Sequence, residues 1–189
     1  MIPNLDIIES KIIEYATASL NRFAKEHKEE KFYGFGLDVN ATYGGILLCF
    51  NTEEDFEKTS QEYIKKWNYT KKDLEDLKLN FGDWKYQGFN LNYEEWQNWN
   101  KYANDIKNYI IFDDDEFMTE EEEDKIFEET EKFSNDFLIS CTNALLKLEK
   151  SGIFEQFEKE DDFFIQVIDH DEDEDEAKKR FELVKKKFV

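Results

Sequence analysis

The sequence is poor in residues that interrupt regular structure and in residues that build disulfide frameworks. Its 189 residues include one proline, seven glycines and two cysteines. With Pro3 as the single proline and no stretch rich in proline, glycine or serine, nothing resembles a linker, so residues 1–189 are expected to form one domain. The cysteines, Cys49 and Cys141, have apolar neighbours, which favours free buried thiols over a disulfide.

Long apolar runs and basic leader segments are also missing. No stretch approaches the roughly 18 uncharged apolar residues that indicate a membrane-spanning helix. The first residues, MIPNLDIIESKIIEYA, carry acids between their apolar side chains and do not begin with a basic segment, unlike a signal peptide. We therefore expect a cytoplasmic protein that does not bind membranes.

Catalytic signatures are equally scarce. The two histidines, His27 and His170, lie at the polar end of a predicted helix and inside an acidic run, and neither has the sequence context of a catalytic triad. Gly34 and Gly36 fall within a strand pattern that no helix start follows, so they do not form a phosphate-binding loop. The sequence predicts neither an enzyme nor a bound cofactor.

Acidic residues are what the chain has in excess: 46 aspartates and glutamates face 25 lysines and arginines, giving a net charge of -21. Such a surface repels nucleic-acid phosphates and anionic lipids and favours a basic protein partner. The alternative is that the acidity only keeps the protein soluble.

Hydrophobic periodicity predicts an α+β fold. Apolar residues recur at helical spacing over residues 5–23, 53–67, 70–77, 93–112 and 119–152 and again in the acidic-to-basic C-terminal segment. Strands are expected over residues 32–39, 45–50, 84–89 and 163–168, the first two joined as a hairpin. Because regular βαβ alternation is absent, we expect a mixed or antiparallel sheet of about four strands packed with amphipathic helices.

The sharpest change of composition is DDDEFMTEEEED at residues 113–124, which holds no basic residue and is expected to lead into the helix whose capping box is Thr119 and Glu122. This block is the candidate partner-binding surface, with Phe117 and Met118 either anchoring a partner or packing onto the domain. Its proposed contact residues are Asp113, Asp114, Asp115, Glu116, Phe117, Met118, Glu120, Glu121, Glu122 and Glu123. The acidic segment 171–176 is a second candidate.

A divalent metal could in principle bind Asp169, His170, Asp171 and Glu172, together with Asp38 or Asp83. Consecutive side chains, however, fan out from either a strand or a helix and rarely converge on one ion. The sequence therefore predicts no metal site, and a solvated acidic helix start is the simpler interpretation.

Four segments together resemble an uncharacterised family of bacterial domains: FYGFGLDVN at 32–40, LLCFNTEEDFEKT at 47–59, GDWKYQGF at 82–89 and FFIQVIDHDEDEDEAKKRF at 163–181. Small acidic domains of this kind are similar to the immunity proteins encoded beside bacterial toxins. The resemblance implies protection by binding a toxin, although it rests on analogy of fold and composition.

Three functions follow from these observations. The first is an immunity or antitoxin-like protein that binds a basic toxin through its carboxylates. The second is a metal-dependent enzyme or regulator that uses the Asp169–Glu172 segment. The third is a housekeeping interaction domain without a toxin. The first requires that the carboxylates gather in one outer patch.

Overall fold

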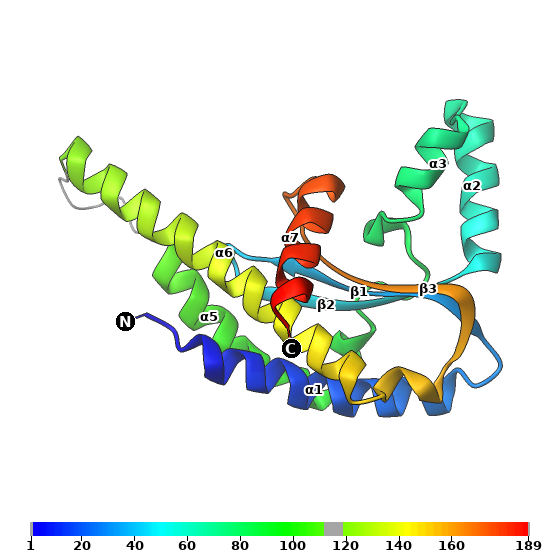
Figure 1. Cartoon of the computed structure of the whole chain (residues 1–189), viewed down its shortest axis with the longest axis horizontal. Helices are drawn as coiled ribbons and strands as arrows, with labels where there is room; N and C mark the ends of the chain where they lie inside the picture. The colour runs from blue at the N-terminus through cyan, green and yellow to red at the C-terminus, as the bar shows by residue number, and fades with distance from the viewer. Residues whose placement is uncertain (1, 112–118, 189) are drawn as a thin grey trace.

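The computed structural model describes residues 2–111 and 119–188, with only the helical backbone described at Glu120. The chain forms a three-stranded sheet surrounded by helices (Figure 1). In chain order the helices and strands are α1 (Leu5–Glu26), β1 (Lys31–Asn40), β2 (Gly45–Thr52), α2 (Glu53–Trp67), α3 (Lys71–Leu77), α4 (Glu94–Gln97), α5 (Trp99–Ile110), α6 (Glu120–Lys150), β3 (Glu158–Asp169) and α7 (Glu174–Lys187), with 3-10 turns at Phe81–Asp83, Phe89–Asn92 and Ile153–Gln156.

The sheet is mixed, which is one of the two alternatives that the sequence left open. Its strand order is β2-β1-β3, with β1 antiparallel to β2 and parallel to β3. The hairpin pairs Asn40 with Gly45, and the parallel pair brings Val39 next to Asp169. This register places the ends of β1 and β3 side by side, although they are far apart in the sequence.

The prediction of a strand over residues 84–89 is wrong, so the described sheet has three strands instead of about four. Only Tyr86 pairs with β2, through reciprocal backbone hydrogen bonds of 3.1 Å with Phe50. Gly88 then turns the chain away at a φ of 65°, a conformation that glycine adopts without steric cost. Beyond Gly88, the side chain of Asn90 replaces strand pairing at this edge of β2: it accepts a hydrogen bond from Leu48 N at 2.8 Å and donates one to Ile46 O at 3.1 Å.

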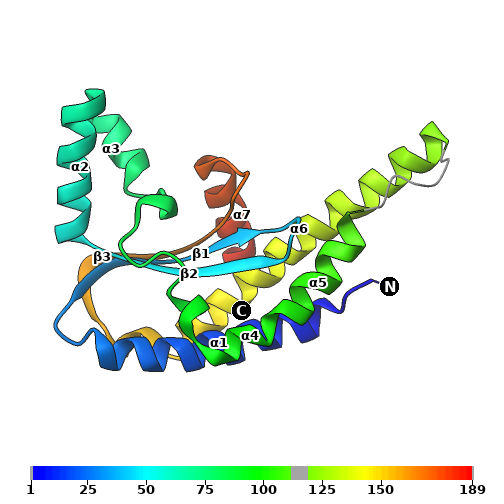
Figure 2. The ribbon, with the colours of Figure 1, turned by 180° about the vertical axis from the view of Figure 1, so that it is seen from behind.

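One face of the sheet carries the main hydrophobic core. Phe35, Leu37 and Val39 of β1 are fully buried between the sheet and the helices α1 and α6. These two helices run side by side below the sheet in Figures 1 and 2. Helix α6 follows its predicted start, because Thr119 and Glu122 form the capping box. Both cysteines are free and buried, as expected.

The helix predicted over residues 93–112 is interrupted. Helix α4 ends at Gln97 and α5 starts at Trp99, with Asn98 between them. The two tryptophans that flank this break are almost fully buried and donate to different partners: Trp96 Nε1 to Ser19 Oγ and Trp99 Nε1 to the carbonyl of Gly44, both at 2.8 Å. They pack in the core, as the sequence indicates, but two separate anchors replace one straight helix.

Helices α2 and α3 form an arm that projects from the opposite face of the sheet, on the side where α7 also rises (Figure 1). The turn between them uses Asn68 at a positive φ of 56° as the C-cap of α2. Helix α3 begins with a capping box of Thr70 and Asp73. Within residues 2–111 and 119–188, none of the helices combines the length and apolar composition needed to cross a membrane.

Candidate functional site

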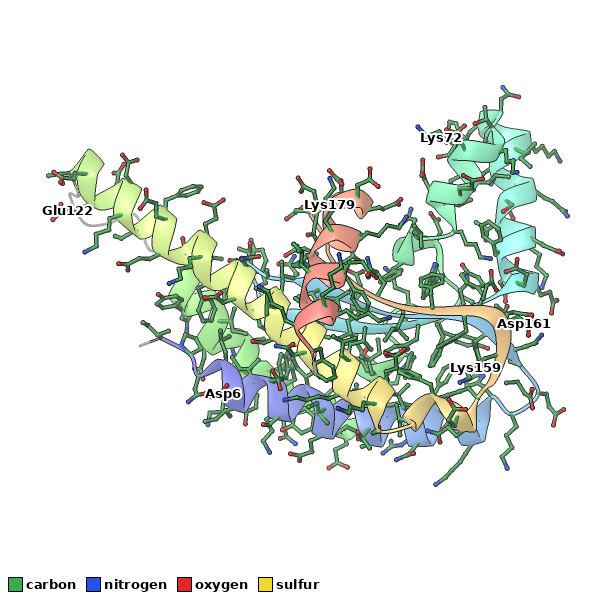
Figure 3. The ribbon with its side chains drawn as sticks, viewed as in Figure 1. Asp6, Lys72, Glu122, Lys159, Asp161 and Lys179 are labelled. Atoms are coloured by element: carbon green, nitrogen blue, oxygen red, sulfur yellow. The ribbon has the colours of Figure 1, made fainter. Side chains whose placement is uncertain are left out.

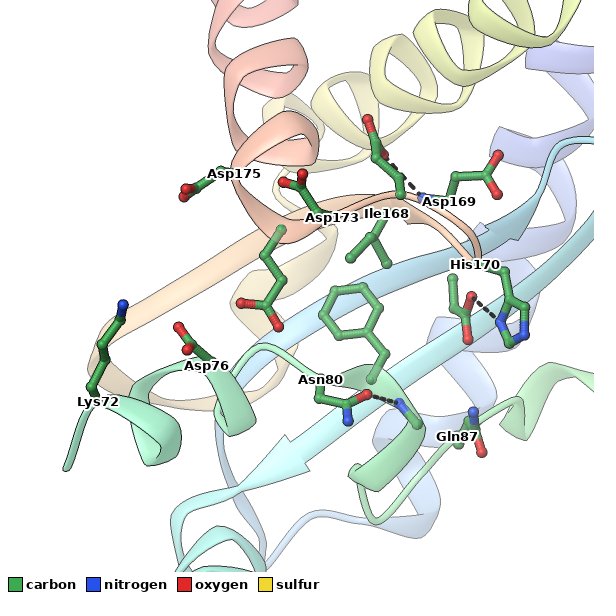
Figure 4. A pocket seen from close by; sticks show the side chains of 14 residues that line it. Lys72, Asp76, Asn80, Gln87, Ile168, Asp169, His170, Asp173 and Asp175 are labelled. Atoms are coloured by element: carbon green, nitrogen blue, oxygen red, sulfur yellow. Dashed lines mark hydrogen bonds and ion pairs between the residues drawn. The ribbon is translucent and has the colours of Figure 1, made fainter. Parts of the chain in front are cut away.

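A cleft with a volume of about 710 Å³ opens over the second face of the sheet, between α3 and the connection from β3 to α7. Figure 4 shows Lys72, Asp76 and Asn80 on one side and Asp173 and Asp175 on the other. The full set of lining residues comprises Asp38, Lys72, Asp76, Asn80, Phe81, Gly82, Gln87, Ile168, Asp169, His170, Glu172, Asp173, Glu174 and Asp175.

The floor of the cleft depends on missing side chains in β1. A Cβ atom at Gly36 would lie 2.2 Å from Cε2 of Phe81, and one at Gly34 would lie 2.9 Å from the ring of Phe164. The rings of Phe81 and Phe164 therefore lie directly on the strand, with Trp84 beside them. From Gly34 to Asp38 the alternation thus gives β1 large apolar side chains on the core side and two glycines on the cleft side.

Asp38 continues the glycine face of β1 and ends it with a carboxylate. Its exposed fraction is 8%, and its Oδ1 lies 4.0 Å from Nδ1 of His170, which is the dashed line drawn at His170 in Figure 4. Burial raises the pKa of Asp38, while His170 and a hydrogen bond from Gln87 oppose that rise. A carboxylate in this position gains stability from any cation that enters the cleft.

The loop after β3 is held by its own acidic side chains. The carboxylate of Asp169 accepts from the backbone nitrogens of Ala41 and Asp171, each at 3.2 Å. Glu172 accepts from Asp169 N and pairs with the guanidinium of Arg180. Only 9% of the Arg180 side chain is exposed, and this side chain also donates to the Val167 carbonyl and to Thr142 Oγ1 of α6, each at 3.3 Å. One wall of the cleft is therefore fixed to the sheet and to α6.

Three carboxyl groups of the cleft have pKa values above their usual range. Burial is the main cause for Asp38, Asp169 and Glu174, and for Glu174 the next cause is the negative charge of Asp76 across the cleft. Among the described residues, Glu172 is the single one of the seven lining carboxylates within salt-bridge distance of a lysine or arginine. The cleft is thus a partly desolvated site of concentrated negative charge.

The described residues offer neither an activated cysteine nucleophile nor a group of side chains arranged to bind a metal ion. Burial raises the pKa of Cys49 to about 12 and also raises that of Cys141, so both thiols stay protonated. Within residues 2–111 and 119–188, no three His, Cys, Asp or Glu side chains are grouped so that they could hold a metal ion. The side chains present are suited to bind a positively charged group by hydrogen bonds and charge.

The candidate residues from the acidic block lie elsewhere or outside the described residues. Asp113, Asp114, Asp115, Glu116, Phe117 and Met118 belong to the undescribed segment, and Glu120 is described only as part of α6. Glu121, Glu122 and Glu123 are exposed in the first turn of α6. Figure 3 shows Glu122 at one end of the molecule and Asp161 near the other, so the acidic side chains do not form one patch.

The structure brings together part of the set that the sequence analysis considered for a metal site. Asp38, Asp169, His170 and Glu172 all line the cleft, whereas Asp83 accepts a hydrogen bond of 2.7 Å from the Tyr63 hydroxyl. Sequence reasoning missed Asp76 of α3 completely. It named Asp173 to Asp175 only as part of the second candidate partner-binding segment, residues 171–176. The one sequence signal for a site on this face of the sheet was Asp38, because it is a charged residue that continues the alternation of Gly34 and Gly36.

Comparison with known proteins identifies a family without a known activity. A family model described as "Domain of unknown function (DUF4303)" matches residues 12–183, which is most of the chain. No protein with a curated description matches the chain. No solved structure matches it either.

Proposed function

We propose that this chain, which belongs to the DUF4303 family, is a binding protein that takes cationic side chains of a basic protein partner into its acidic cleft. The observation that carries the proposal is the set of cleft carboxylates without a lysine or arginine partner among the described residues. Asp38 is buried and Asp169 and Glu174 are partly buried. A desolvated carboxylate without a cationic partner costs free energy in the free protein, and an arriving ammonium or guanidinium group offsets that cost.

The shape of the cleft supports a protruding side chain as the bound group. Asp38 lies deep on the floor with an exposed fraction of 8%, while Asp76, Asp173 and Asp175 line the cleft higher up, on α3 and at the start of α7. A lysine or arginine reaches such a floor with its long apolar stem along Phe81 and Ile168 and its charge at Asp38. The outer carboxylates then attract neighbouring basic residues and raise the association rate.

The test is binding of fluorescent oligolysine and oligoarginine peptides to the full chain, measured by anisotropy at low and physiological salt. We expect the double variant Asp38→Asn/Glu174→Gln to weaken binding by about tenfold or more, because each removes a desolvated charge. The matched control is Glu121→Gln/Glu123→Gln, which removes the same number of charges at the start of α6.

The two variants separate the possible outcomes. A larger loss with the α6 pair would place the basic partner at the acidic block, as the sequence alone suggested. An equal, small loss with both pairs would mean that only net charge attracts the peptides, and the cleft proposal would then be wrong.

In its more specific form, the proposal is that the basic partner is a toxin that this protein neutralises, with the carboxylates of the cleft in place of the single outer patch that the sequence-based hypothesis required and that the structure does not form. It is supported by the resemblance of small acidic domains to immunity proteins and by the affinity of such a cleft for cationic side chains. Co-expression with the product of the adjacent gene tests it. We expect a co-purifying complex and rescued growth with the natural chain, and neither with Asp38→Asn/Glu174→Gln. A toxic neighbour that the natural chain fails to bind or neutralise would contradict it.

A further inference from the structure

The tip of the arm combines exposed apolar side chains with lysines, as the end of α7 also does at Leu183 and Lys185 to Lys187. Trp67 and Ile64, one turn apart at the end of α2, have exposed fractions of 67% and 45%. Lysines surround them on both sides of the turn, in the sequence KKWNYTKK at residues 65–72. Large exposed apolar side chains next to charges of one sign are typical of a surface that binds a partner.

The lysines at this tip are largely available for an external partner. Lys66 pairs with Glu62 at 3.0 Å, whereas Lys65, Lys71 and Lys72 make no salt bridge with any described residue. The neighbouring acid Asp73 caps α3, where it accepts from Thr70 N at 2.7 Å, and it keeps its charge. Residues 63–72 hold four lysines and no acid, although Lys72 also lines the cleft. We name the surface formed by Ile64, Lys65, Trp67 and Lys71 the basic tip.

The opposite end of the molecule carries the complementary surface. Helix α6 extends beyond the sheet, as Figures 1 and 2 both show. Along its first turns Glu121, Glu122, Glu123 and Asp124 are exposed, and Phe127 follows with an exposed fraction of 67%. We name this surface the acidic end. Figure 3 places Glu122 and Lys72 at opposite ends of the molecule, so the two surfaces cannot meet within one chain.

We propose that the basic tip of one copy binds the acidic end of a second copy, so that the protein assembles head to tail. Trp67 would pack against Phe127, and Lys65 and Lys71 would pair with the first glutamates of α6. Such a contact joins two different surfaces, so it leaves one free basic tip and one free acidic end at every stage and allows further copies to add.

The net charge of -21 does not prevent this contact. Helix α2 has 15 residues, which corresponds to a length of about 22 Å, and the first turns of α6 extend beyond the sheet in Figures 1 and 2. At physiological salt the Debye length is about 8 Å, so the two acidic bodies are screened from each other while the ends touch.

Mixing two complementary variants tests the proposal sharply. The tip variant is Lys65→Ala/Trp67→Ala, and the end variant is Glu123→Ala/Phe127→Ala; all four positions are exposed, so the fold should tolerate both. Sedimentation velocity over a concentration series should show dimers and larger species for the natural chain. Each variant alone should have its self-association weakened about tenfold or more. Their mixture should form a one-to-one dimer that grows no further, because one intact tip meets one intact end.

A matched control replaces an exposed apolar side chain elsewhere. Leu183→Ala on α7, where Leu183 has an exposed fraction of 58%, should leave self-association unchanged. A natural chain that stays monomeric over the whole series would overturn the proposal. So would assembly that neither variant weakens, which would locate the contact elsewhere, or a mixture that forms no dimer. Binding of peptides in the cleft is a separate measurement, so failure here leaves the proposed function standing.

Discussion

The two faces of the sheet carry different kinds of side chain: one forms the hydrophobic core and the other lies below the acidic cleft. The core face presents Phe35, Leu37 and Val39 to α1 and α6 and is fully buried. The cleft face presents Gly34, Gly36 and Asp38, with a small aromatic cluster at one end and an open acidic cleft at the other. One strand, β1, supplies both faces by alternating large apolar residues with glycines and one acid.

On this one strand, the residues that stabilise the fold lie on the opposite face from those to which we assign binding. Burial of apolar area stabilises the fold at about 25 cal/mol for each Å² removed from water, and the core face holds most of that area. The cleft face gives up side-chain volume, so that aromatic rings pack against backbone and a hollow remains beside them. Substitutions on the core face should therefore affect unfolding, and substitutions of the cleft carboxylates should affect binding.

The largest effect is expected in the core, at Phe137 of α6, which is fully buried. Phe137→Ala should lower the free energy of unfolding by about 3 to 5 kcal/mol, because it removes apolar contact and leaves a cavity. The matched control on the same helix is Phe127→Ala, which should change it by less than about 0.5 kcal/mol because Phe127 is exposed. Urea unfolding of dilute protein measures both, and equal effects would contradict this view of the core face.

The next effect tests whether the two faces are coupled through Arg180, which joins Thr142 of α6 to Glu172 of the cleft wall. Arg180→Ala should cost about 3 kcal/mol, because it leaves the largely buried Glu172 carboxylate without its partner. The double variant Arg180→Met/Glu172→Gln should recover much of this loss. If the single and double variants unfold at the same urea concentration, the ion pair does not hold the wall.

A smaller loss is expected on the cleft face at Gly36. Gly36→Ala should destabilise the protein by about 1 to 3 kcal/mol, because the new Cβ would lie 2.2 Å from Phe81 and would displace its ring. Gly45→Ala on β2 is the control, since its Cβ would meet no atom closer than 3.6 Å. Thermal unfolding followed by circular dichroism distinguishes them. A Gly36→Ala protein as stable as the control would mean that the ring moves freely.

Much of the fold could be predicted because its signals are local. Alternation in β1, the helical spacing of α1 and the capping box of α6 each need only neighbouring residues. The segment 84–89 misled the prediction because its aromatics resemble a strand. What ends the pairing there is the positive φ of Gly88 together with the long-range hydrogen bonds of Asn90 to β2.

The candidate site could be predicted only in part, because the cleft is formed by contacts across the chain. The sequence indicated Asp38 and His170 only as possible metal ligands, and their contact follows from the pairing of Val39 with Asp169. Asp76 enters from the arm, whose direction depends on the turn at Asn68. Composition alone drew attention to the acidic block instead, since a run of acids is visible without any knowledge of packing.

The smallest effects concern pH, and they have opposite signs at two carboxyl groups. Burial would raise the pKa of Glu30, but hydrogen bonds from Tyr86, Lys85 and His27 outweigh it and lower that pKa from 4.5 to about 2. Glu30 therefore adds stability above pH 4.5, and this is lost as the pH falls towards 2. The pKa of Asp38 is raised by burial, so its contribution is present below its ordinary value of 3.8 and is lost as the pH rises through the folded value.

Urea unfolding at a series of pH values should show that Glu30→Gln removes part of the decline in acid, by about 1 kcal/mol after screening by solvent. It should also show that Asp38→Asn removes part of the decline above pH 4 and makes the protein more stable than the natural chain near neutral pH. A variant of Asp38 that is less stable at neutral pH would mean that the carboxylate is satisfied within the chain, and the cleft would then have no unpaired charge to offer a partner.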